Sequence, residues 1–188
     1  MIKLRSSLLV TGVALGLGAF LPATAAAEER TCRGTIGATT LDNVRVPQDA
    51  SCVLQGTHVK GTVKVERRAT LRAEGVRVIG NVQGENARRV AVVQTSRVDG
   101  SVQVVQGRSA KVANSRVNAD ILYDENTDAL RVVDNRVGGN VQAFQNTGGV
   151  AIRRNVIDGN LQCKANSSRP VGGGNQVGGN KEDQCAGL

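Results

Sequence analysis

The stretch Val137-Gly138-Gly139-Asn140-Val141-Gln142 returns twenty residues later as Ile157-Asp158-Gly159-Asn160-Leu161-Gln162. Each copy has an aliphatic residue, then a small residue two positions on, followed by a polar, an aliphatic and a polar residue. Copies occur at steps of 19, 20, 19, 20, 20 and 20 residues, with the small residue at Gly61, Gly80, Gly100, Ala119, Gly139, Gly159 and Gly179. Seven registered copies of one unit indicate a repeat architecture with one structural unit per repeat.

The composition of the repeat favours a β-solenoid over a leucine-rich repeat, because Leu is sparse while Val, Gly and Asn dominate. Val forms strands, whereas Gly and Asn accept the left-handed backbone of sharp corners. Twenty residues are too few for a helix, a strand and two loops, but they fit one coil of short strands. We therefore predict an all-β fold, a single-stranded, right-handed parallel β-helix of about seven coils stacked roughly 4.8 Å apart.

Two aliphatic columns mark the expected inner face of the solenoid. They lie seven and five positions before the repeating Val, and side chains two residues apart point to the same side of a strand. The first column is Leu71, Ala91, Ala110, Leu130 and Val150, and the second is Ala73, Val93, Val112, Val132 and Ile152. Only 2% of the chain is aromatic, and we attribute this deficit to a bore that is too narrow for rings.

Asparagines also recur at the period of the repeat. Stacked Asn side chains can pass amide hydrogen bonds from one coil to the next, and Asn suits tight corners. We therefore predict structural ladders in two columns, Asn126, Asn146 and Asn166, and Asn135, Asn155 and Asn175.

The first 27 residues have the features of a secretory signal peptide. Lys3 and Arg5 precede an uncharged apolar run over residues 8–21, and small residues over 23–27 fit a cleavage site. The run is shorter than the ~20 residues that a membrane-spanning helix needs. We predict a secreted, extracellular β-helix domain over residues 28–188 with no further membrane span. Removal of Lys3 and Arg5 lowers the formal net charge of +8 by two.

The four cysteines predict two disulfides, because disulfides are usual in exported chains. Cys32 and Cys52 are 20 residues apart, and Cys163 and Cys185 are 22 apart. Each spacing is about one coil, which brings the partners onto adjacent coils near disulfide geometry. Of the three possible connectivities we predict Cys32–Cys52 and Cys163–Cys185, one at each end. A metal site built from all four would require the two ends of the solenoid to meet.

Basic residues form the most informative polar pattern. One column stands directly before the repeating Val, and a partial column stands five positions earlier: Arg77, Arg97, Arg116 and Arg136, and Arg72, Lys111 and Arg131. Stacked like charges repel one another, and we expect Asp99, Asp134 and Asp158 to offset part of this repulsion. Such a line suits an anionic polysaccharide or wall polymer. The alternative is a solvated face that discourages sheet aggregation. Nucleic acid is disfavoured because stacking aromatics are lacking.

The fourth repeat departs from the pattern and is rich in carboxylates, with Asp120, Asp124 and Glu125, followed by Asp128 and Asp134. Calcium prefers oxygen ligands, and calcium-dependent pectate lyases share the β-helix fold. The short repeat, however, leaves no room for the long loops that wall a catalytic cleft. The lone His58 cannot form a triad by itself, and the cysteine pairing leaves no free thiol. We predict no catalytic residue, no metal and no cofactor.

With these motifs the chain resembles a group of small secreted bacterial parallel β-helix proteins of unassigned function. The resemblance rests on three pieces: the segment over residues 40–47, the G-N-V-Q repeats, and the run over residues 159–181 with its Gly172-Gly173-Gly174-Asn175. It implies secretion and the β-helix fold, and it transfers no catalytic residue.

These patterns predict a non-catalytic module of the cell surface or matrix that binds an anionic polymer through the arginine column, as a monomer or as an end-associating chain. Two alternatives stay open. One is a structural subunit that assembles end to end, as bactofilin-type β-helices do. The other is a polysaccharide-active enzyme of the pectate-lyase-like type.

Overall fold

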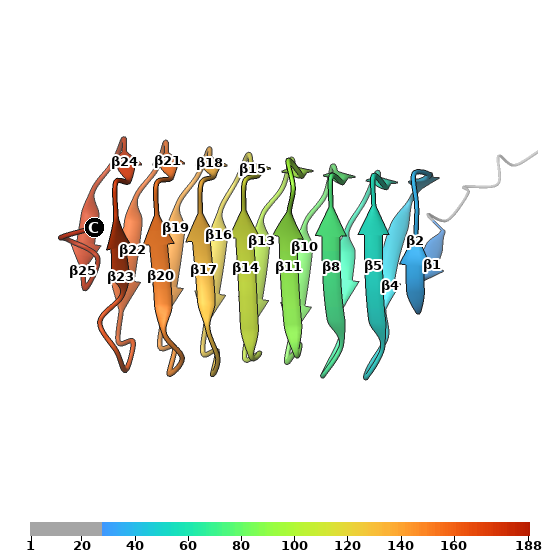
Figure 1. Cartoon of the computed structure of the whole chain (residues 1–188), viewed down its shortest axis with the longest axis horizontal. Helices are drawn as coiled ribbons and strands as arrows, with labels where there is room; N and C mark the ends of the chain where they lie inside the picture. The colour runs from blue at the N-terminus through green and yellow to red at the C-terminus, as the bar shows by residue number, and fades with distance from the viewer. Residues whose placement is uncertain (1–27) are drawn as a thin grey trace, which may run out of the picture.

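A computed structural model describes residues 28–188, which form a parallel β-solenoid of about eight turns (Figure 1). The predicted all-β parallel solenoid is confirmed, with one turn more than expected. The first turn was not counted because it lacks the small residue of the repeat. Two residues lie between Leu41 and Val44, whereas three lie between their register partners Val59 and Val63. The predicted signal peptide, residues 1–27, lies outside the described residues. Over residues 28–188 no helix has the length and apolar character to cross a membrane.

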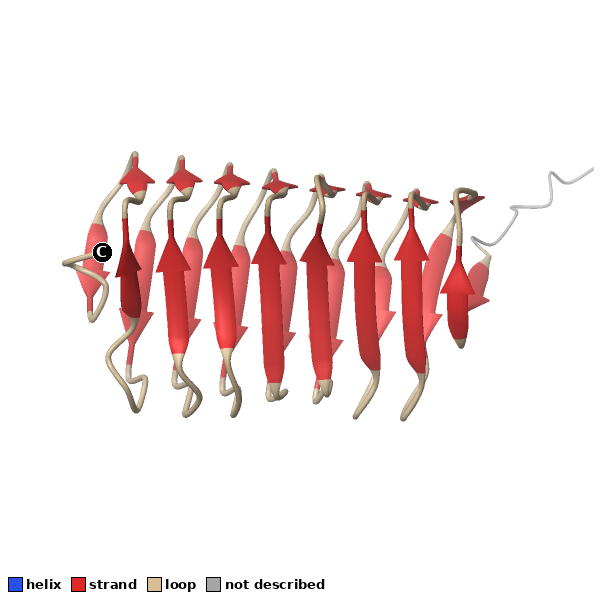
Figure 2. Ribbon diagram, viewed as in Figure 1, coloured by secondary structure: helices blue, strands red, loops and turns tan. Residues whose placement is uncertain are grey.

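Three parallel sheets run the length of the solenoid, and each turn contributes one strand to each sheet (Figure 2). Sheet A holds β1 (Glu29–Thr31), β4 (Asn43–Val46), β7 (Val63–Val65), β10 (Val82–Glu85), β13 (Val102–Val105), β16 (Ile121–Asp124), β19 (Val141–Phe144), β22 (Leu161–Lys164) and β25 (Lys181–Asp183). Sheet B holds β2 (Gly34–Ile36), β5 (Ser51–Gln55), β8 (Thr70–Glu74), β11 (Arg89–Val93), β14 (Ser109–Ala113), β17 (Leu130–Val133), β20 (Val150–Arg153) and β23 (Val171–Gly173).

Sheet C is built from two-residue strands: β3 (Thr40–Leu41), β6 (His58–Val59), β9 (Arg77–Val78), β12 (Arg97–Val98), β15 (Arg116–Val117), β18 (Arg136–Val137), β21 (Val156–Ile157) and β24 (Gln176–Val177). In Figure 1 sheet B faces the viewer, sheet A lies behind it and sheet C runs along the top. The bore between the three sheets is filled by aliphatic side chains, chiefly Val, Leu, Ile and Ala.

The expected inner columns of sheet B are wrong in one turn. In β11 the inner positions belong to Val90 and Val92, which pair with Leu71 and Ala73 of β8. Ala91 and Val93 lie on the outer side of the strand, although both are buried. The offset arises because the following corner holds one residue more than its neighbours. Gln94 and Thr95, both with positive φ, stand where the preceding turn has Gly75 alone.

The expectation that the bore excludes rings is also wrong. Tyr123 points inward and is 1% exposed, in register with Val104 and Ala143. Its hydroxyl donates a hydrogen bond to the carbonyl oxygen of Arg131 at 3.2 Å. The small Ala143 in the next turn leaves room for the ring, and burial raises the pKa of the phenol. Phe144, by contrast, lies half-buried on the outer face of sheet A.

The repeating glycines serve close packing rather than left-handed corners, which corrects the role expected from the sequence. A Cβ at Gly80 would lie 2.5 Å from the carbonyl oxygen of Gly61, and one at Gly159 would lie 2.7 Å from that of Gly139. Neither glycine has a positive φ. Many left-handed positions are instead held by larger residues at the other corners, for example Asn114, Asp134 and Arg154. The small residue is needed because successive turns approach backbone to backbone.

Both asparagine columns form hydrogen-bonded ladders inside two of the corners. Asn126 Nδ2 donates to Asn146 Oδ1 at 3.1 Å, and Asn146 donates to Asn166 at 2.9 Å. Asn135, Asn155 and Asn175 repeat the arrangement at 3.0 and 2.9 Å. Each of these amides also reaches a backbone carbonyl of another turn, as Asn126 does with Val104. The ladders therefore satisfy polar groups that burial would otherwise make costly.

The predicted disulfides are confirmed. Cys32 pairs with Cys52 and Cys163 pairs with Cys185, with Cα–Cα distances of 5.6 and 5.2 Å. Each links neighbouring turns near one end of the solenoid. At the C-terminal end Gln184 Oε1 accepts a hydrogen bond from Asn166 at 3.0 Å, which completes the first ladder.

Candidate anion-binding faces

The four arginines of the first basic column lie side by side on sheet C. Arg97 is in register with Arg77 on one side and with Arg116 on the other, and Arg116 is in register with Arg136. The two-residue strands β9, β12, β15 and β18 alternate one inward Val with one outward Arg. We call Arg77, Arg97, Arg116 and Arg136 the arginine row. It is a line of exposed guanidinium groups that advances by one strand spacing, about 4.8 Å, per turn.

The arginine row occupies the middle of the solenoid. Thr40 and His58 precede it in the same column, and Val156 and Gln176 follow it. Its side chains are well exposed, 45% for Arg97 against 56% for Arg77 and 55% for Arg136.

Two aspartates offset part of the charge of the arginine row. Asp99 lies 2.7 Å from Arg97 and 3.7 Å from Arg77, and Asp158 lies 3.5 Å from Arg136. Arg116 bonds instead to the neutral Asn118 at 2.9 Å. The row thus has four guanidinium groups and two carboxylates, so its net charge is positive.

Asp134 does not take the part expected of it. It accepts two hydrogen bonds from Arg154, at 2.7 and 2.8 Å, at the corner between sheets B and C. Both residues occupy the same left-handed corner position in successive turns, which aligns the carboxylate with the guanidinium. This hydrogen bonding lowers the pKa of Asp134 and raises the pKa of Arg154.

The second basic column lies on sheet B, so the structure does not join it to the arginine row in one face. Lys111 is in register with Arg131, but Ala91 separates Lys111 from Arg72. Arg72 forms an ion pair with Glu74 of its own strand. Arg72 is therefore a paired cation that stands apart, and Lys111 and Arg131 are neighbours further along the sheet.

Lys111 and Arg131 border a shallow pocket on sheet B with a volume of about 210 Å³. Its lining is mostly basic or small: Arg89, Ser109, Ala110, Lys111, Ala129 and Arg131. Arg89 was not among the basic residues selected from the sequence. It lies two positions before the column of Arg72, Lys111 and Arg131, in register with Thr70 and Ser109, and no column of basic residues marks that position.

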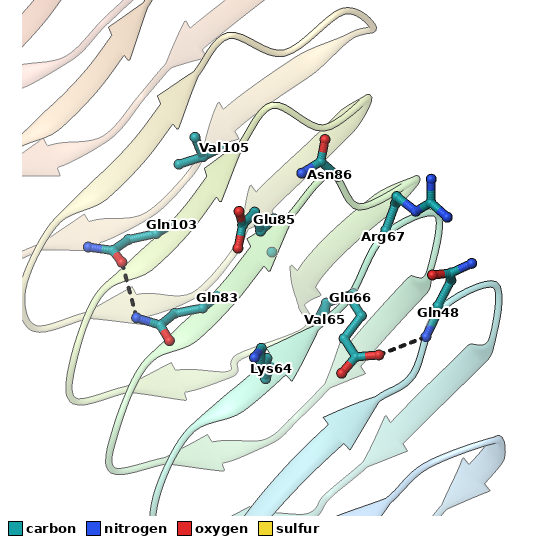
Figure 3. A pocket seen from close by; sticks show the side chains of 11 residues that line it. Gln48, Lys64, Val65, Glu66, Arg67, Gln83, Glu85, Asn86, Gln103 and Val105 are labelled. Carbon is teal, nitrogen blue, oxygen red and sulfur yellow. Dashed lines mark hydrogen bonds between the residues drawn. The ribbon is translucent and has the colours of Figure 1, made fainter.

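Sheet A carries a larger groove of about 640 Å³, shown in Figure 3, whose charges are mixed. Lys64 and Arg67 line it together with Glu66 and Glu85. Gln83 donates to Gln103 at 3.3 Å, and Glu66 accepts from the backbone N–H of Gln48 at 3.0 Å (Figure 3). With both signs balanced, this groove has no evident preference for an anion.

The charge of each face over residues 28–188 is thus distinct: mixed on sheet A, partly offset on sheet C, and without ion pairs around the pocket of sheet B. No protein-family model matches this chain, and neither a curated protein nor a solved structure matches it.

The carboxylates of the fourth repeat do not converge on one site. Asp120 accepts hydrogen bonds from Asn140, and Asp128 pairs with Arg108 at 2.9 Å on a different corner. Asp124 lies on the outer face of sheet A, in register with Val105 and Phe144, and burial raises its pKa. Over residues 28–188 no group of three or more His, Cys, Asp and Glu side chains is placed to hold a metal ion.

Proposed function

We propose that the protein is a secreted, non-catalytic module of the cell surface or matrix that binds an anionic polymer along the arginine row. The observation that carries this proposal is one exposed guanidinium per turn over four successive turns, in register. A polymer lying along the solenoid axis would meet a new cation at every strand spacing. Guanidinium groups suit this role because their fork of donors binds carboxylate, sulfate or phosphate with two hydrogen bonds.

The incomplete neutralisation of the row supports binding rather than a purely solvated surface. Exposed ion pairs contribute only about 0–1 kcal/mol each, so an incoming anion can displace Asp158, which is 49% exposed, at little cost. The two disulfides are consistent with an extracellular location, since disulfides persist in oxidising compartments.

End-to-end self-assembly is less well supported. Arg30 of β1 stands in register with Val44, whose column continues through the sheet to Lys181 of β25. A head-to-tail junction that continued sheet A would therefore bring Arg30 against Lys181 at an inner position. Inward-pointing charges on terminal strands are a known device against edge-to-edge association.

Catalysis of the pectate-lyase-like type is less well supported too, because three of the carboxylates in and after the fourth repeat are engaged at separate corners. Asp120 is held by Asn140, Asp128 by Arg108 and Asp134 by Arg154.

The test is retention on immobilised polygalacturonate and dextran sulfate over a salt series, because salt screens exposed charges. The Arg97→Glu/Arg116→Glu variant is compared with Lys164→Glu/Arg169→Glu, which changes the net charge equally on exposed residues outside the row. We expect the row variant to elute at clearly lower salt than the control variant. Equal elution of the two variants, or retention that ignores salt, would overturn the proposal.

A further inference from the structure

We infer that the pocket on sheet B is a subsite for one tetrahedral oxyanion, a phosphate or sulfate group, held by Arg89, Lys111 and Arg131. The inference builds on the proposed function, since it names the anionic group that such a polymer would carry. It concerns a different face from the arginine row, and it makes its own measurable claim.

The strand register places the three cations around a floor of short side chains. Arg89 lies beside Ser109 on the neighbouring strand, and Lys111 follows Ser109 by two residues on the same outer face. Arg131 lies beside Lys111 one turn further along. Ser109 and Ala129 are too short to fill the space between them, and this leaves the hollow of about 210 Å³.

The three cations form no ion pair within residues 28–188. In the part of the chain that the structure describes, none of them has a carboxylate oxygen within 4.0 Å. The acidic residue next to the pocket in sequence, Asp128, is already paired with Arg108 at 2.9 Å. Arg72, which belongs to the same column as Lys111, is paired with Glu74. The pocket thus brings together three neighbouring cations of sheet B that have no ion pair among residues 28–188.

Such a cluster is unfavourable unless an anion occupies it, because like charges at close range repel one another. The repulsion is modest in water and is relieved when an anion is bound. A water molecule takes up about 30 Å³ of the liquid, so the hollow has room for one oxyanion with some of its hydration shell. It is too small for a folded partner.

The arrangement favours a tetrahedral oxyanion over a carboxylate. One guanidinium already satisfies both oxygens of a carboxylate with two hydrogen bonds. Donors that arrive from three side chains in different directions are matched better by the three outward oxygens of a phosphate or sulfate group than by the two coplanar oxygens of a carboxylate. Two guanidinium groups and one ammonium group supply fork-shaped and single donors for these oxygens.

The experiment is an NMR titration of the isotopically labelled protein with sodium phosphate and, separately, sodium sulfate, at an ionic strength held constant with sodium chloride. The side-chain resonances of Arg89, Lys111 and Arg131 report on the pocket. We expect saturable shifts confined to these residues for at least one oxyanion. Shifts spread evenly over all arginines, including the arginine row, would overturn the inference.

Two triple variants sharpen the test. Arg89→Gln/Lys111→Gln/Arg131→Gln removes the pocket cations, and Arg77→Gln/Arg97→Gln/Arg116→Gln removes the same charge from the row. We expect saturation to be lost in the first and kept in the second, and saturation that survives in the first contradicts the inference. Should the first variant fail to fold, Lys111→Gln alone must weaken binding several-fold for the inference to stand.

The two oxyanions also distinguish the source of the group, since preference for phosphate indicates a phosphorylated polymer and preference for sulfate a sulfated one. Failure of this inference is separable from failure of the proposed function. Saturation of the pocket without row-dependent polymer retention would refute the function and keep the subsite. Row-dependent retention without saturation would refute the subsite alone.

Discussion

Asp99 lies within ion-pair distance of two successive arginines, 2.7 Å from Arg97 Nε and 3.7 Å from Arg77 Nη2. It also accepts a hydrogen bond from Asn118 Nδ2 at 2.7 Å, and Asn118 in turn accepts from Arg116. One carboxylate therefore organises three of the four guanidinium groups in the arginine row. The charge that the row offers a ligand therefore depends on this residue and, at Arg136, on Asp158.

Substitution of Asp99 is expected to strengthen polymer binding. The Asp99→Asn variant removes the main internal competitor for Arg77 and Arg97, so it should elute from dextran sulfate at higher salt. Its stability should fall by about 1 kcal/mol, because the two guanidinium partners are 56% and 45% exposed and the amide of Asn keeps an oxygen as acceptor. The matched control is Asp134→Asn, which frees Arg154 at a corner outside the row. An equal gain in retention from both variants would show that net charge alone governs binding.

Close approach of the turns predicts a sharp difference between two glycines. Gly159→Ala places a methyl group 2.7 Å from the carbonyl oxygen of Gly139 and should destabilise the fold by about 1–3 kcal/mol. Gly149→Ala meets nothing within 4 Å and should be neutral or slightly stabilising. The midpoints of unfolding in guanidinium chloride measure this difference. Equal midpoints for the two variants would contradict the packing role.

The asparagine ladder predicts a cost for removing an internal rung. Asn155→Ala leaves the buried amide groups of Asn135 without the Oδ1 acceptor that they share, which should cost about 1–3 kcal/mol or more. Asn180→Ala serves as the control, because Asn180 is exposed at the end of the solenoid. Thermal unfolding followed by circular dichroism measures both, and a ladder without structural value would make the two variants equal.

The carboxyl group of Asp124 predicts a pH dependence of stability. Burial raises its pKa above the usual 3.8, and one of its oxygens is buried with no hydrogen-bond partner among residues 28–188. The folded state therefore binds the proton more tightly than the unfolded state, so stability falls as the pH rises from about 3.8 through the raised pKa and is then level.

Asp124→Asn should accordingly stabilise the protein at pH 7 and have little effect at pH 3. The gain should be below about 1 kcal/mol, because the side chain is only partly buried. Unfolding midpoints at the two pH values measure it. A variant that is equally or more destabilised at pH 7 than at pH 3 would refute the assignment.

The charges at the two ends predict the effect on self-association. We expect the Arg30→Val/Lys181→Val variant to gain mass with concentration in light scattering, because two apolar inner positions would replace two like charges. The unaltered protein should keep one mass over the same range. If the mass of the unaltered protein rises with concentration, Arg30 and Lys181 do not prevent end-to-end association.

The repeat alone was sufficient to predict the architecture. The spacing of Val137 and Ile157 with their Gly-Asn-aliphatic-Gln partners sets the length of a turn, and the alternation along each strand sets its faces. The cysteine spacings predicted both disulfides, because one period of the repeat is also the distance between neighbours in space. These inferences succeeded because they depend only on period and on residue type.

The register of β11 could not be predicted in this way, because a corner with one added residue shifts a strand without changing the overall period. Turns of 19 and 20 residues occur side by side, and counting back from Val98 cannot show where the difference lies. This single offset misplaced Ala91 and Val93. Arg89 was missed for a different reason, because its register partners Thr70 and Ser109 are not basic and the position shows no repeating charge. The position of Tyr123 depended likewise on the size of its neighbour Ala143, which is a matter of packing.

The sequence by itself determined the solenoid, its period, its end disulfides and the existence of an in-register line of arginines, because each follows from periodicity along the chain. Only the tertiary structure decided which cations have a carboxylate as a neighbour and which do not. Asp99, Asp134 and Asp158 all lie within three residues of the repeating aliphatic residue, yet Asp134 faces Arg154 while the other two face the arginine row. Ion pairing depends on distances of a few ångströms between turns, and these are set by the corners rather than by the repeat.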